Sequence, residues 1–121
     1  MARVVVESAR LLPARPGAAA EESWVVATDL AEELARAGTP FHRAHQIVGA
    51  LVLDSVRRGK KPADWTGEEL AAFAPEFRAD MARLMHPREG MKTREIPGGT
   101  GPEAVRAALA EAAARLKRMR A

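Results

Sequence analysis

Cysteine is absent from this chain of 121 residues, and aromatic side chains make up only 4% of it. The absence of cysteine excludes disulfide bonds and thiolate metal sites. Alanine supplies much of the 47% of residues that are hydrophobic. A chain rich in alanine, leucine, glutamate and arginine favours helix over sheet. We therefore expect an all-α fold, and the length fits a single domain.

Long apolar runs are also missing. No segment approaches the roughly 18 apolar residues that a membrane-spanning helix needs. The N-terminal stretch is interrupted by Arg3, Glu7 and Arg10, so it lacks the continuous apolar core of a secretory signal. We expect a cytoplasmic protein with no membrane partner.

Runs of charges of the same sign are scarce over most of the chain. Nineteen basic residues face sixteen acidic ones, for a net charge of +3, and the two signs alternate along predicted helices. This pattern is typical of a solvated surface of mixed sign. The tail is the exception, because four cations crowd into its last residues: Arg115, Lys117, Arg118 and Arg120.

The chain divides into an N-terminal element with a linker, residues 1–19, and a helical domain, residues 20–121. The prolines and glycine at 13, 16 and 17 are expected to end the first element. Residues 18–37 have a helical composition. Within them, Asp29 and the glutamate three residues later form the pattern of a capping box, with Thr28 as an alternative cap.

A glycine and a proline separate the next two predicted helices. Gly38 is expected to end one helix in a left-handed conformation. Thr39 is expected to cap the next helix, with Pro40 at its first position. Apolar residues at helical spacing predict that this central helix extends to about Arg58, and His45 lies on the same face as its apolar side chains.

The last predicted helix follows the longest irregular stretch of the chain. That stretch ends in Gly98, Gly99, Thr100 and Gly101, after which Pro102 is expected to occupy the first helical position, with Gly101 or Thr100 as the cap. Apolar residues then recur every three or four positions through the final four turns. Together these signals predict a small helical domain of about five helices, built from two helix-turn-helix-like pairs.

Several residues are candidates for chemistry, but each has a structural explanation. His42 and His45 are three positions apart, yet a metal site needs three or four ligands and no acidic partner lies one turn away. The carboxylates around Asp29 fit a helix start. The loop from Gly98 precedes a helix, but it lacks the Lys-Ser/Thr ending of a phosphate-binding loop. We therefore assign no catalytic, cofactor-binding or metal-binding residue.

Nucleic-acid binding is a separate alternative. The two helices on either side of residues 38–40 have the spacing of a helix-turn-helix, and the chain is basic. A recognition helix must present a polar, basic face to the groove. Here the second helix offers His42, Arg43 and Gln46 and then mostly apolar residues, which argues against DNA as the partner.

Four segments in register resemble argininosuccinate lyases. Residues 24–32 read WVVATDLAE and residues 38–49 read GTPFHRAHQIVG, similar to that family's ATDLA helix and its PFR-AH-xVG segment. Residues 69–77 resemble its EL–F-SP-F turn, and residues 98–105, GGTGPEAV, resemble its GGTAPEAV helix start. The resemblance covers about residues 20–116. Residues 91–96 depart from the family pattern, and residues 1–19 match it only loosely.

This resemblance implies a C-terminal domain in the fumarase/aspartase superfamily. Members of the family cleave argininosuccinate to arginine and fumarate in arginine biosynthesis, and they are homotetramers. Their catalytic serine lies in a GSS-MP-K-N loop of another domain, and that signature does not occur in this sequence. The implied partner is therefore the remainder of a lyase chain or a lyase core. The isolated chain is expected to be inactive and to need no cofactor.

The resemblance also implies folding roles for the matching residues. Thr28 and Asp29 are expected to start a helix, and Gly38 and Pro40 to make the sharp reversal between two helices. His45 is expected to form a hydrogen bond within that corner, at the edge of the core. The residues Gly98, Gly99, Thr100 and Pro102 are expected to turn the chain into the closing helix. Two origins stay open: an excised domain of a lyase, or a separately encoded interaction or regulatory module that pairs with a lyase core. As a hypothesis, the domain flanks the active-site entrance and influences its closure.

Overall fold

The fold is helical throughout the part of the chain that the computed structural model describes, residues 2–10 and 12–120. Within this part there are seven α-helices and three short 3₁₀ helices, so the predicted all-α class is confirmed, with more and shorter helices than expected. Among these residues no helix is both long and apolar enough to cross a bilayer. In chain order the elements are α1 (Ala2–Ser8), α2 (Ala14–Glu22), η1 (Trp24–Val26), α3 (Ala27–Arg36), α4 (Phe41–Arg58), η2 (Pro62–Asp64), α5 (Gly67–Phe73), η3 (Ala79–Met85), α6 (Pro87–Lys92) and α7 (Pro102–Arg120).

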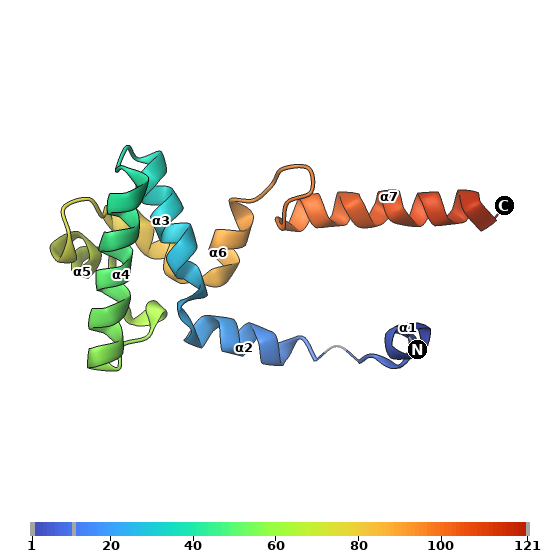
Figure 1. Ribbon diagram of the computed structural model, residues 1–121, viewed down its shortest axis with the longest axis horizontal. Helices are drawn as coiled ribbons and strands as arrows, with labels where there is room; N and C mark the ends of the chain where they lie inside the picture. Colours follow the sequence, from blue (N-terminus) through green and yellow to red (C-terminus); the bar gives the residue numbers. More distant parts are fainter. Residues whose placement is uncertain (1, 11, 121) are drawn as a thin grey trace.

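The hydrophobic core lies where α3 and α4 pack side by side, with α5, η3 and α6 closing around them (Figure 1). Leu30 and Leu34 from α3 belong to the same core cluster as Leu51 from α4, and all three are fully buried. The predicted central helix is thus confirmed as α4, which has five buried residues along its length. The rest of the core comes from Ala31 of α3 and from the short helices and the loops beside them, through the side chains of Val26, Trp65, Leu70, Phe77, Met81, Leu84 and Met85.

The turn between α3 and α4 is fixed by Gly38, which has a φ of 101°. The amide of Gly38 donates to the carbonyl of Ala35, and the amide of Thr39 donates to that of Leu34, which together form a Schellman motif. Because the Thr39 amide closes α3, Pro40 becomes the residue before α4, and Phe41 is its first residue. The prediction that Thr39 caps α4 and that Pro40 is its first residue was therefore wrong by one position.

The start of α3 also differs from the prediction. The helix begins at Ala27, without a side-chain cap, because the η1 turn with its buried Val26 already supplies helical backbone before it. Thr28 and Asp29 therefore lie inside the first turn, and neither caps the helix. Asp29 still carries negative charge where the helix dipole favours it.

The proline and glycine at 16 and 17 do not interrupt the chain as expected. They lie in the first turns of α2, which begins at Ala14. Proline is tolerated there because the amide it lacks would have no intrahelical acceptor. Met1, Leu11 and Ala121, which belong to the predicted 1–19 and 20–121 segments, lie outside the described residues.

Two helical arms extend from the core on the same side (Figure 1). One consists of α1 and α2, and the other is α7. The predicted last helix is confirmed in its start at Pro102. It was expected to close the fold, but none of its described side chains is buried.

Candidate functional site

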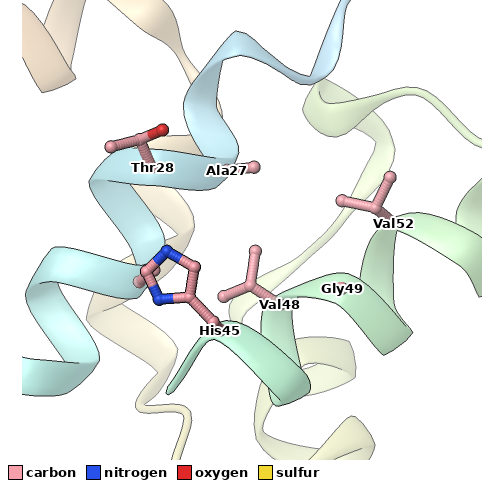
Figure 2. A pocket seen from close by; sticks show the side chains of 7 residues that line it. Ala27, Thr28, His45, Val48, Gly49 and Val52 are labelled. Carbon is pink, nitrogen blue, oxygen red and sulfur yellow. The ribbon is translucent and has the colours of Figure 1, made fainter. Parts of the chain in front are cut away.

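A shallow hollow of about 270 Å³ lies between α3 and α4. Ala27 and Thr28 line it from α3 (Figure 2), and so does Ala31. From α4 come His45, Val48, Gly49 and Val52. The ATDLA and AH-xVG segments, which are separate in the sequence, therefore face each other across one surface.

His45 is the main polar group of this hollow. Its Nδ1 lies 3.2 Å from the carbonyl oxygen of Phe41, one turn earlier, and its ring lies against the exposed Phe41 ring at a centroid distance of 4.2 Å. A carbonyl can only accept, so in the neutral ring Nδ1 carries the proton and Nε2 is an acceptor. The predicted hydrogen bond at this corner is present, but the imidazole is exposed and does not lie at the edge of the core.

The hollow contains one imidazole and one hydroxyl on otherwise apolar walls. Among the described residues that line it there is no carboxylate, so these residues supply neither an acid–base pair nor a charge relay for nucleophilic catalysis. Within the described ranges no three His, Asp or Glu side chains gather as metal ligands. His42 instead lies 3.0 Å from the amide nitrogen of Gln46. Such a surface can receive an apolar group with a hydrogen-bond donor.

Asp29 points to the other side of α3, where it meets α6 and the segment that follows. Its carboxylate accepts from the guanidinium of Arg94, which lies 3.9 Å from Glu32 as well. The hydrogen bond to the Asp29 carboxylate raises the pKa of the Arg94 guanidinium above its ordinary value. The same carboxylate fills the space that a Cβ on Gly90 would occupy. Asp29 therefore joins α3 to α6 and to the chain that leads to α7.

The glycine loop, residues 98–101, is held in place by the backbone of Arg94 and the side chain of Glu95. The Arg94 carbonyl accepts from the amide of Gly101 at 3.1 Å, and it would collide with a Cβ on Gly99. Gly98 has a φ of 78°, which favours glycine. Thr100 is exposed and lies between Gly99 and Gly101, in the segment that leads to Pro102.

Glu95 caps α7, a role that Thr100 or Gly101 was expected to have. Its two carboxylate oxygens accept from the amides of Glu103 and Ala104, at 3.1 and 2.8 Å. A carboxylate at this end of a helix also suits the dipole. A Cβ on Gly101 would collide with this carboxylate, so the glycine makes room for the cap.

Sequence reasoning missed Gly90, Arg94 and Glu95. In the sequence, residues 91–96 were distinguished only by their departure from the family pattern. One local signal was available for Glu95: a carboxylate shortly before a glycine-rich helix start. No signal in the sequence pairs Asp29 with Arg94, because the two are 65 positions apart.

Comparison with known proteins assigns the family. The family described as "Argininosuccinate lyase C-terminal" matches residues 24–92, which cover the packed core and both sides of the hollow. The chain is 73% identical over 112 residues to the argininosuccinate lyase of Solibacter usitatus, covering 93% of the chain and 24% of the relative. It is 45% identical to that of Thermus thermophilus over 78% of the chain and 20% of the relative, and 38% identical to that of Moorella thermoacetica over 89% and 23%.

The chain thus spans about a quarter of the length of the curated relatives it matches. The matched region contains the ATDLA and AH-xVG segments and the EL–F turn. The resemblance predicted from these segments is confirmed: this chain belongs to the argininosuccinate lyase C-terminal family.

Proposed function

We propose that this chain acts as the C-terminal accessory domain of an argininosuccinate lyase, the enzyme that cleaves argininosuccinate to arginine and fumarate. In this proposal the domain spans residues 20–121, residues 1–19 link it to the core, and the assembled enzyme is a homotetramer. The observation that carries the proposal is the family match over the packed core. The chemistry belongs to the lyase core, because the hollow offers one imidazole and one hydroxyl without a carboxylate.

The fold suits an attached domain. The core between α3, α4 and the short helices buries its own apolar residues, so it keeps its shape while the arms reach outward. The α1–α2 arm exposes Val4, Val5 and Val6 at 64–77% of their surface, and α7 exposes Leu109, Leu116 and Met119 at 55–74%. Apolar side chains on projecting helices favour contacts with another protein surface.

A chimera tests this function. The last quarter of the Solibacter lyase is replaced by this chain, and fumarate formation from argininosuccinate is followed by ultraviolet absorbance. We expect the chimera to be active and tetrameric, whereas the Solibacter lyase truncated before this quarter loses activity or assembly. We expect the isolated chain to release no fumarate. Fumarate release by the isolated chain, or a folded but inactive chimera, would overturn the proposal.

A further inference from the structure

One face of α7 carries a continuous apolar stripe, formed by Val105, Leu109, Ala112, Leu116 and Met119. These residues are spaced four, three, four and three positions apart. At 100° per residue they fall within an arc of about 80°. This is the spacing of the a and d positions of a coiled coil, in which a neighbouring helix inserts side chains between them. All five are exposed, with Met119 at 74% and Leu109 at 65% of their surface.

The direction of α7 is fixed by contacts at its start. Glu95 holds two amides of its first turn, and Gly101 is bonded to the Arg94 carbonyl. Arg94 is in turn anchored on Asp29 of the core. Amphipathic helices gain most of their stability from packing rather than from propensity. An arm that is oriented from the core, and that has no buried side chain among its described residues, is therefore suited to a partner that covers its stripe.

Charge indicates the kind of partner. On the helix, Arg115 lies along one edge of the stripe and Arg120 along the other, with Lys117 beyond it. Among the described residues, the ion pair in α7 is that between Glu103 and Arg106 at the opposite end. The C-terminal half of the stripe is thus an apolar strip between unpaired cations. Its complement is an apolar groove edged with carboxylates.

We propose that the α7 stripe docks this domain onto the lyase core, in an apolar groove between core helices whose edges carry Asp or Glu side chains. This inference rests on the proposed function. A second copy of the chain fits less well. In a parallel pair of α7 helices, the four cations at the end of one copy would lie beside the same four cations of the other. In an antiparallel pair, the only acidic residues of α7 near those cations would be Glu103 and Glu111 of the other copy, and Arg106 would add a further cation there.

The first test uses the chimera with the double substitution Leu109→Glu and Leu116→Glu. Its matched control is Ala110→Glu with Ala114→Glu, which adds the same charge to the opposite side of the same turns. We expect the stripe variant to lower activity or tetramer content about tenfold or more, as loss of buried interface residues does, and the control to stay within about twofold. Circular dichroism of the isolated chains checks that both variants remain helical.

A second measurement uses the absence of cysteine from this chain. Leu116→Cys and Ala114→Cys are labelled with a maleimide, and the modified peptides are quantified by mass spectrometry. We expect Leu116→Cys to react much more slowly in the chimera than in the isolated chain, and Ala114→Cys to react equally in both. Charge reversal at Arg115 and Arg120 is expected to weaken assembly, and more strongly at low salt.

The outcomes separate the two proposals. An inactive wild-type chimera contradicts the proposed function itself. An active chimera in which stripe and control variants behave alike overturns the docking inference alone. The inference is also overturned if the isolated chain forms a dimer in sedimentation that Leu116→Glu abolishes, which assigns the stripe to a second copy. Binding of the isolated chain to anionic phospholipid vesicles, lost in the same variant, would assign it to a lipid surface and overturn the inference as well.

Discussion

At the scale of single residues, two glycines in helices have opposite surroundings. A Cβ on the buried Gly90 would overlap the Asp29 carboxylate, whereas a Cβ on Gly49 meets nothing within 4 Å. We predict that Gly90→Ala lowers the free energy of unfolding by about 1–3 kcal/mol, the usual cost of overpacking. Gly49→Ala should raise it by up to about 1 kcal/mol, because alanine favours helix. Urea unfolding followed by circular dichroism measures both, and equal effects of the two substitutions would contradict the packing around Asp29.

Glu69 gives a prediction of pH dependence. The ammonium of Lys60, at 2.7 Å, and the backbone amide of Thr66 hold the pKa of its carboxyl below the ordinary 4.5. A lowered pKa in the folded state means that the charged form stabilises the fold above the unfolded pKa. That contribution is lost as the pH falls through the folded value. Glu69 also completes a capping box with Thr66 at the start of α5.

We therefore predict that Glu69→Gln destabilises the chain at neutral pH and that this difference shrinks as the pH falls below 4.5. Glutamine keeps the capping geometry, so the comparison isolates the charge. Unfolding free energies of both proteins from about pH 7 to pH 3 measure it. Asp80 and Glu89 also have lowered pKa values, but they are present in both proteins and cancel. A difference that stays constant to the lowest pH would contradict the prediction.

At the scale of elements, the ends of α3 and α4 were predictable, whereas the beginning of α3 was not. Gly38 and Gly59 end α3 and α4 with positive φ, a conformation that glycine adopts without strain, so the signal is local. The start of α3 could not be read in the same way. Burial of Val26 extends helical backbone before the polar residues that normally mark a start. Tertiary packing thus overrode a capping pattern at Thr28 and Asp29.

A buried hydrogen bond joins α4 to the segment after it. Ser55 donates to the Leu51 carbonyl at 2.6 Å and accepts from Nε1 of Trp65 at 3.0 Å. Both side chains are buried. We predict that Ser55→Ala costs about 1–3 kcal/mol, because it leaves the indole N–H without an acceptor. In a Trp65→Phe background the same substitution should cost less, and unfolding of the four proteins measures this coupling. Equal costs in both backgrounds would show that the indole hydrogen bond contributes nothing.

At the scale of the whole molecule, the sequence predicted the all-α class and the family but not how the pieces are joined. The hollow joins two segments that were recognised separately, Thr28 in one and His45 in the other. The link from Asp29 through Arg94 to Gly101 spans most of the chain and depends on packing that no local pattern encodes. The sequence also did not predict that α7 is exposed. Apolar residues at helical spacing predict that one face of a helix is covered, but they do not show which molecule covers it.

The Asp29–Arg94 contact leads to a prediction about the arrangement of α7 relative to the core. Spin labels on Arg57→Cys in α4 and Ala114→Cys in α7 give the distribution of distances between core and arm by electron–electron double resonance. We predict that Asp29→Asn broadens this distribution, because the neutral amide holds the Arg94 guanidinium less strongly than a carboxylate does. Glu33→Gln is the matched control: Glu33 lies on the same helix but pairs with Arg36, Arg78 and Arg83, none of which is in the glycine loop. If Asp29→Asn left the width unchanged, or if both variants broadened it equally, the Glu95 cap and the glycine loop would suffice to orient the arm without an anchor on α3.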